Sequence, residues 1–185
     1  MASGAIDRMG KTDDGTTVTD YDAEETRRQI SISTALAPLE WKKDKFNLLD
    51  TPGYFDFEWE VIEALTVADS ALIVMGAVSG VTVGTQKAWK LCRNRDLPRA
   101  FVINRMDTEN ADYGKVVDSL VSTYGNVVAP LQWPIMQGGK FAGYVDLVEK
   151  KGYLFDGDNT KETEIPGYIS DQFHVYRNQF VESSA

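Results

Sequence analysis

Apolar residues in the first part of the chain form continuous runs that alternate with segments in which they recur at helical spacing. Two of the runs, at residues 71–75 and 100–104, are typical of strands buried on both faces of a parallel sheet. A run at 45–50 ends on a carboxylate and predicts a third strand, and a weaker alternation at 30–41 predicts another. Residues 4–29 are polar, so we expect a loop with some short helix there.

Helical spacing predicts three helices between or after these strands, at residues 56–67, 83–95 and 113–124. Strands that alternate with helices are typical of an α/β fold with a doubly wound, mostly parallel sheet. The single cysteine, Cys92, lies on the inward side of the second helix, so we expect a buried small apolar residue rather than a nucleophile.

The pattern changes after Pro130, where shorter segments are separated by Gly-containing turns. The elements predicted there are three short strands, a polar loop and a helix, at residues 131–135, 143–148, 152–155, 156–167 and 168–181. We therefore expect two parts: an α/β part over residues 1–129 and a small α+β subdomain over residues 130–185.

Length and charge exclude several classes of function. The 185 residues suffice for one domain with a core, and the net charge of -9 disfavours unaided binding to nucleic acid, whose phosphates need facing Lys and Arg. The longest apolar stretch, residues 70–78, is too short to span a bilayer, and the N-terminus lacks the apolar core of a signal peptide. We expect a cytoplasmic protein with no membrane segment and no direct DNA contact.

The first candidate site is the sequence Asp50-Thr51-Pro52-Gly53, which directly follows a predicted strand. A carboxylate at that strand end lies at the edge of the sheet where α/β proteins bind ligands, and it suits Mg²⁺, usually through water. Gly53 lets the backbone approach a phosphate and offer its N–H. The alternative is an ordinary turn, because Asp, Pro and Gly are also common turn residues.

The second candidate site is Asn104-Arg105-Met106-Asp107, which follows another predicted strand. An Asp at this place can accept two hydrogen bonds from guanine, which adenine cannot offer. Asn104 can contact the base edge, and the stem of Arg105 can cover the base face. The alternative is a polar loop that caps the next helix.

Taken together and in this order, the two motifs resemble the phosphate-side and guanine-reading motifs of translational GTPases. The segment Arg28-Gln29-Ile30-Ser31-Ile32 resembles their first switch loop. The stretches 130–135 and 141–147 resemble the subdomain inserted in the G domain of elongation factor G, so nearly the whole chain resembles that type of GTPase. The tetracycline-resistance ribosomal protection proteins are an alternative within the same class.

The resemblance implies a P-loop GTPase fold that takes GTP or GDP with Mg²⁺. It implies that the full-length protein couples GTP hydrolysis to action on the ribosome. It also implies a role for each matched residue. The phosphates would be bound by Asp50, Thr51, Pro52 and Gly53, and guanine would be bound by Asn104, Arg105 and Asp107. The Mg²⁺ ion would be bound by Ser31 and Asp50.

Several positions depart from the family pattern. Tyr54 stands where the family has the His that positions the attacking water, and a neutral phenol cannot supply the charge of an imidazolium. Tyr54 is thus a weak catalytic candidate, and we expect slow or altered hydrolysis. Gln29 replaces the usual Gly, Ser31 the usual Thr and Arg105 the usual Lys.

The 185 residues contain no Gly-rich phosphate loop that ends in Gly-Lys-Ser/Thr. Gly10-Lys11-Thr12 has the last letters of that motif but no preceding apolar strand, and we interpret it as a coincidence. We expect the loop and the first strand of the family before Met1, and the last helix of the insert to be truncated. An isolated chain of this kind is expected to be inactive, and a non-catalytic interaction fragment is the competing hypothesis; a doubly wound protein with coincidental motifs is a third.

Overall fold

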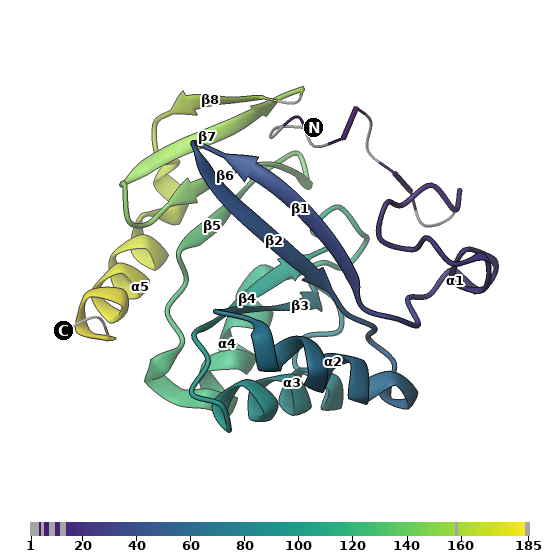
Figure 1. Cartoon of the computed structure of the whole chain (residues 1–185). Coiled ribbons are helices and arrows are strands. Elements are labelled where there is room, and N and C mark those ends of the chain that lie inside the picture. The colour runs from purple at the N-terminus through teal and green to yellow at the C-terminus, as the bar shows by residue number, and fades with distance from the viewer. Residues whose placement is uncertain (1–3, 5, 8–9, 12–13, 158, 184–185) are drawn as a thin grey trace. The chain divides into compact units, whose positions relative to one another are not determined.

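The computed structural model describes residues 4, 6–7, 10–11, 14–157 and 159–183. The chain divides into two compact units, one made of Met1–Leu72 and Gln86–Ala100 and the other of Ile73–Thr85 and Phe101–Ala185. The elements of each unit are labelled in Figure 1.

The first unit contains a short helix and a long antiparallel hairpin. Helix α1 (Ala23–Arg28) is followed by β1 (Ala35–Trp41) and β2 (Asp44–Asp50), which pair along their whole length (Figure 1). The two turn residues, Lys42 and Lys43, both have positive φ, as the tight turns that suit twisted hairpins require. The strand predicted at 30–41 begins only at Ala35, because residues 31–34 are bonded to acidic side chains instead.

The hairpin leaves large apolar side chains uncovered. Leu36 is 62% exposed, and Phe46 and Leu48 are each 46% exposed. Phe46 lies opposite Leu39 and Leu48 lies opposite Ala37, so these four side chains share one face of the ribbon, whereas Leu36 belongs to the other face.

After the hairpin, the 3-10 helix η1 (Phe55–Phe57) leads into helix α2 (Glu58–Val67). Strand β3 (Ala71–Gly76), helix α3 (Val83–Arg93) and strand β4 (Arg99–Asn104) follow. The N–H of Ala71 donates to Pro98 O and that of Ala77 donates to Asn104 O, so the two strands run in the same direction. This parallel β-α-β arrangement confirms the predicted α/β class.

The prediction that β3 and β4 are buried on both faces is wrong. Leu72 is 63% exposed, Val74 61% and Val102 39%, whereas Ile73 and Met75 are buried. An apolar run is buried on both faces only where both faces of its sheet are covered. In the described residues β3 and β4 form a sheet of two strands, and alternate side chains of β3 face solvent.

Helix α4 (Tyr113–Tyr124) provides the first core of the second unit. Its predicted bounds are confirmed, and Val116, Val117 and Leu120 are each 2% exposed. Val116 and Leu120 pack with Met75 and Val128, so the helix is fixed against the end of β3. A short 3-10 helix, η2 (Gly125–Val127), follows.

The second core of this unit belongs to a four-stranded antiparallel sheet. Its strands are β5 (Gln132–Gln137), β6 (Lys140–Asp146), β7 (Lys151–Asp156) and β8 (Asn159–Thr163). The 3-10 helix η3 (Gly167–Ile169) and helix α5 (Ser170–Ser183) complete it (Figure 1). The core residues are Ile135, Val145, Leu147 and Ile169. The prediction of a polar loop at residues 156–167 is wrong, because these residues contain strand β8.

Candidate functional site

The phosphate-side motif begins where strand β2 ends. Asp50 is the last residue of β2 and is exposed, Pro52 is buried, and Gly53 is exposed. A Cβ added at Gly53 would meet no atom within 4 Å, and its φ is not in the left-handed region. Neither conformation nor packing in the described chain therefore demands a glycine here.

The segment after this motif is fixed by a lysine from helix α3. Lys87 Nζ lies 2.9 Å from Glu58 Oε2 and 4.4 Å from the centre of the Phe55 ring. These contacts hold η1 and the start of α2 in place. Tyr54, just before η1, is 57% exposed and makes no capping hydrogen bond, so its phenol is available to solvent.

The guanine-reading motif begins where strand β4 ends. Asn104 is the last residue of β4, and its Oδ1 accepts the N–H of Arg105 at 2.8 Å. Arg105 has φ 59°, a left-handed conformation that turns the chain sharply. Its carbonyl accepts the hydroxyl of Thr108 at 2.8 Å, which closes the turn. Met106 is buried and anchors the loop, while Asp107 is exposed.

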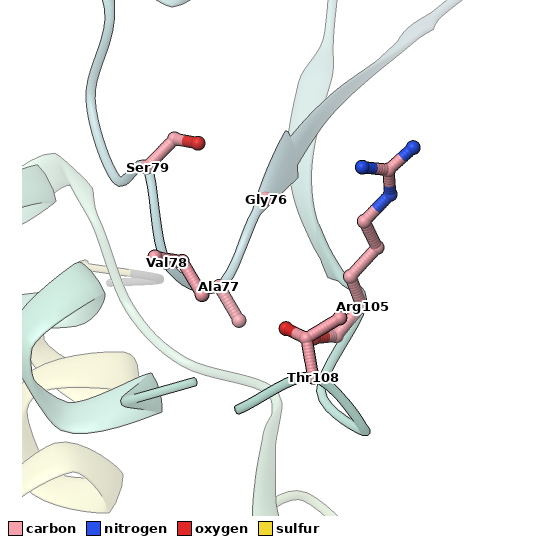
Figure 2. Close-up of a pocket in the computed structure, with 6 residues that line it drawn as sticks. All are labelled: Gly76, Ala77, Val78, Ser79, Arg105 and Thr108. Carbon is pink, nitrogen blue, oxygen red and sulfur yellow. The ribbon is translucent and has the colours of Figure 1, made fainter. Parts of the chain in front are cut away.

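A cavity of about 320 Å³ lies beside this loop, within the second unit. Its lining residues are Gly76, Ala77, Val78, Ser79, Arg105 and Thr108. In Figure 2 the side chains of Ala77 and Thr108 point toward one another, and the guanidinium of Arg105 points away from them. The volume is at the lower end of the range for small-molecule pockets.

Residues 76–79 were not predicted as part of a site. They follow the carboxyl end of β3, and the rule that ligands bind outside the carboxyl ends of parallel strands would have found them. The motif residues that sequence reasoning did select lie in different units, Asp50 to Gly53 in the first and Asn104 to Asp107 in the second.

The third candidate segment contains Ser31. Its hydroxyl donates to Asp20 Oδ1 at 2.7 Å, so its proton is used and its oxygen lone pairs stay available. A serine hydroxyl and the exposed Asp50 carboxylate are oxygen ligands of the kind that Mg²⁺ takes. Among the residues that the structure describes, no three His, Cys, Asp or Glu side chains cluster for a metal.

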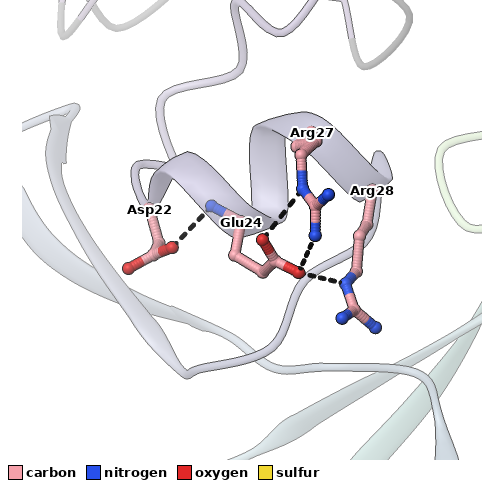
Figure 3. A network of polar contacts seen from close by, with 4 residues as sticks. All are labelled: Asp22, Glu24, Arg27 and Arg28. Atoms are coloured by element: carbon pink, nitrogen blue, oxygen red, sulfur yellow. Dashed lines mark hydrogen bonds and ion pairs between the residues drawn. The ribbon is translucent and has the colours of Figure 1, made fainter.

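Helix α1, just before Ser31, is stabilised by its own polar network. Asp22 Oδ1 accepts the N–H of Glu24 at 2.7 Å, and the Glu24 carboxylate binds Arg27 and Arg28 (Figure 3). Hydrogen bonds from Arg27 and Arg28 lower the pKa of Glu24 to about 2. A helix of six residues needs such contacts, because short helices are marginal in water.

Two other candidate residues, Lys11 and Cys92, lie outside both motifs. Lys11 lies in a tight turn in which its carbonyl accepts the N–H groups of Asp14 and Thr16, at 3.2 and 3.1 Å. Thr12 lies outside the described residues, so the interpretation of Gly10-Lys11-Thr12 as a coincidental match stays a prediction. Cys92 is 2% exposed, and burial raises the pKa of its thiol, which confirms a small apolar role.

Comparison with known families decides the class. The family described as the elongation factor Tu GTP binding domain matches residues 1–181. The chain belongs to this family. The predicted resemblance of the chain to translational GTPases is therefore confirmed, and guanine nucleotide is the ligand class of the family.

Relatives within this family are translation factors. Elongation factor G of Mycoplasma pneumoniae and that of Mycoplasma genitalium are each 37% identical over 186 residues, covering 99% of this chain. Elongation factor G of Granulibacter bethesdensis is 33% identical and covers 98%. A crystal structure of a protein from Thermus thermophilus has a TM-score of 0.91 and 35% identity over 97% of this chain. The chain spans 27% of the length of each of these proteins.

Every helix in the part of the chain that the structure describes is too short or too polar to traverse a lipid bilayer.

Proposed function

We propose that this chain is the guanine-nucleotide-binding part of a GTPase that acts on the ribosome in the manner of elongation factor G. The observation that carries the proposal is that both family motifs are present where strands end, at Asp50 after β2 and at Asn104 after β4. The relatives named elongation factor G support the ribosome as the partner of the whole protein and the cytoplasm as its location.

The guanine-reading role belongs to the loop after β4. Asp107 lies in the turn between Arg105 and Thr108 and is exposed, so its carboxylate can accept the two N–H groups of guanine. The Asn104 side chain is oriented by the N–H of Arg105, and the long stem of Arg105 can lie over the base. The neighbouring cavity gives room for part of a ligand.

The phosphate role belongs to residues 50–53. Open space at Gly53 lets a phosphate approach the backbone, and Thr51 and Pro52 join it to the end of β2. Asp50 and Ser31 would hold Mg²⁺, which when bound neutralises charge on the phosphates.

Tyr54 takes the place of the water-positioning residue in this proposal. Its exposed phenol can hydrogen-bond a water molecule but carries no positive charge near neutral pH. We therefore infer that the whole protein hydrolyses GTP more slowly than a relative with histidine at this position.

We also propose that the chain comprises part of a G domain over residues 1–129 and the inserted subdomain over residues 130–185. The support for the second is its own four-stranded sheet and its own core of Ile135, Val145, Leu147 and Ile169.

The test of guanine binding is a titration with fluorescent GDP and GTP, with an adenine nucleotide as control. In the whole protein, Asp107→Asn should weaken GTP binding by 10-fold or more, roughly, and improve binding of a xanthosine nucleotide, because the amide mispairs with guanine. Glu109→Gln is the matched control, since it removes an exposed charge from the same loop and should change neither value. Unchanged affinity and preference in Asp107→Asn would refute the guanine assignment.

The same titration of the 185-residue chain tests the phosphate site. Because these residues contain no Gly-rich phosphate loop, we expect no saturable binding. Tight guanine-selective binding would instead place the phosphate site elsewhere in the chain, with the turn at Gly10 and Lys11 as the first region to test.

A further inference from the structure

Glu25 is the most deeply buried charged side chain among the described residues, and it fastens the segment that follows helix α1. It is 0% exposed, and its Oε1 accepts the N–H groups of Ile32 at 2.9 Å and Ser33 at 3.0 Å. Its Oε2 accepts the N–H of Asp22 at 3.1 Å. An ordinary capping box accounts for the bond to Asp22 only. The other two bonds reach seven and eight residues onward and fix residues 32 and 33.

Glu60 of helix α2 fastens the next residue. Its Oε2 accepts the N–H of Thr34 at 2.6 Å, and its carbonyl accepts the hydroxyl of Thr34 at 3.3 Å. Glu60 is itself 8% exposed. The backbone on the C-terminal side of Ser31 is thus held by two buried carboxylates from two helices, which fixes where Ser31 lies.

Asp20 fixes how the Ser31 side chain is turned. Its Oδ1 accepts the hydroxyl of Ser31 at 2.7 Å, and its Oδ2 accepts the hydroxyl of Thr17 at 2.9 Å. Its carbonyl accepts the hydroxyl of Thr26 at 3.3 Å, which ties it to α1. Both carboxylate oxygens are occupied by O–H donors, so Asp20 is an anchored acceptor and not a side chain free to turn toward other donors.

We propose that Asp20 is the positioning residue for Ser31 as a metal ligand. By accepting the hydroxyl proton it directs the oxygen lone pairs of Ser31 away from itself and makes that oxygen a better donor to a hard cation. Acceptors behind metal ligands act in this way, and their loss weakens metal binding by 10- to 100-fold, roughly. The role of Ser31 toward a metal rests on the function proposed above, whereas the fastening of residues 31–34 does not.

The hydrogen bonds of Ile32 and Ser33 to Glu25 are tested on the 185-residue chain without nucleotide. Amide hydrogen exchange at Ile32 and Ser33 should accelerate by 10-fold or more, roughly, in Glu25→Gln, because one anionic acceptor serves both groups. Glu24→Gln is the matched control, since Glu24 is a neighbour on the same helix and bonds only within it in the network drawn in Figure 3. Equal amide exchange at Ile32 and Ser33 in both variants would show that Glu25 does not hold these residues in place.

The positioning role is tested in the whole protein by the Mg²⁺ concentration that gives half-maximal retention of fluorescent GTP. Asp20→Asn should raise this concentration by 10-fold or more, roughly, without changing amide exchange at Ile32 and Ser33. In a Ser31→Ala background, Asp20→Asn should have no further effect, because the hydroxyl on which it acts is gone.

An unchanged Mg²⁺ requirement in Asp20→Asn would overturn the proposal, as would an equal effect in the Ser31→Ala background. Absence of GTP binding in the unaltered whole protein would refute the proposed function and the metal role together. The exchange measurement would still decide the fastening of residues 31–34.

Discussion

Gln29 ends helix α1 in a conformation that costs energy for any residue with a side chain. Its φ is 56° and its ψ is 41°, the left-handed region, and its N–H donates to the carbonyl of Glu25. Glycine occupies this region without the clash between Cβ and the backbone. The preference of the family for Gly at this point of the switch segment therefore has a local physical reason.

Gln29→Gly should stabilise the chain by about 1 kcal/mol, because the strained conformation becomes unstrained. The measurement is the free energy of unfolding in urea. Gln29→Ala keeps the Cβ and should bring no such gain. If Gln29→Ala stabilised as much as Gln29→Gly, loss of the side chain and not relief of strain would be the cause.

Tyr54→His should raise the GTP hydrolysis rate of the whole protein by 10-fold or more, roughly, since an imidazole positions water and can carry charge near neutral pH. Single-turnover hydrolysis is the measurement, with nucleotide affinity followed alongside. Tyr54→Phe keeps the ring, removes the hydroxyl and should slow hydrolysis further. Equal rates in all three proteins would exclude a role for this position.

The two motifs were predictable because each directly follows an apolar run, and a run that ends on Asp or Asn marks a strand end. The hydrogen bond between Asp20 and Ser31 was not predictable, because it joins residues 11 positions apart in a polar segment that shows no hydrophobic period. The left-handed backbone of Arg105 was equally hidden, because no glycine marks the turn.

Among the elements, helix α4 depends on its N-cap. Asp112 Oδ1 accepts the N–H of Lys115 at 3.0 Å, which satisfies one of the free donors of the first turn. Asp112→Ala should lower the free energy of unfolding by about 1 kcal/mol, measured in urea. Asp112→Asn keeps an oxygen acceptor and should lose much less. A loss of the same size in Asp112→Asn would mean that charge, and not the cap, matters.

The elements that the sequence predicted best are those with a strong period. Helix α4 repeats apolar residues on one side and ends before Gly125, so both its ends were predictable. Strand β8 was missed because Asn159–Thr163 is polar and mostly exposed, and only backbone pairing with β7 makes it a strand. The exposure of β3 was missed because a run of apolar residues does not report what covers each face.

At the scale of the whole molecule, three carboxylates are charged more readily than usual: the exposed Glu24, whose pKa is lowered by Arg27 and Arg28, and also Glu25 and Asp112. Burial alone would raise the pKa of Glu25, but hydrogen bonds from the backbone N–H groups of Ser33, Ile32 and Asp22 outweigh it and hold the pKa below its ordinary value. The N–H of Lys115 likewise lowers the pKa of Asp112. A carboxyl whose pKa is lowered by folding stabilises the fold above its unfolded pKa and loses that contribution as pH falls through its folded pKa.

Stability should therefore hold from neutral pH down to about pH 5 and then fall as the solution becomes more acidic. The measurement is the thermal midpoint between neutral pH and about pH 3. Glu25→Gln removes one of the three groups, so its midpoint should be lower at neutral pH and should decline less in acid. A steeper acid decline in Glu25→Gln than in the unaltered chain would contradict the assignment.

The uncovered leucine and phenylalanine side chains on the β1–β2 hairpin have a practical consequence for work at the bench. Dyes such as ANS fluoresce when they meet exposed apolar surface, which is why they usually signal a loosened protein. We expect such dyes to bind the folded chain at Leu36, Phe46 and Leu48 and to fluoresce before any unfolding. In a dye-based thermal-shift assay the fluorescence would then be high already before heating. Tryptophan emission or circular dichroism would report unfolding more reliably than the dye.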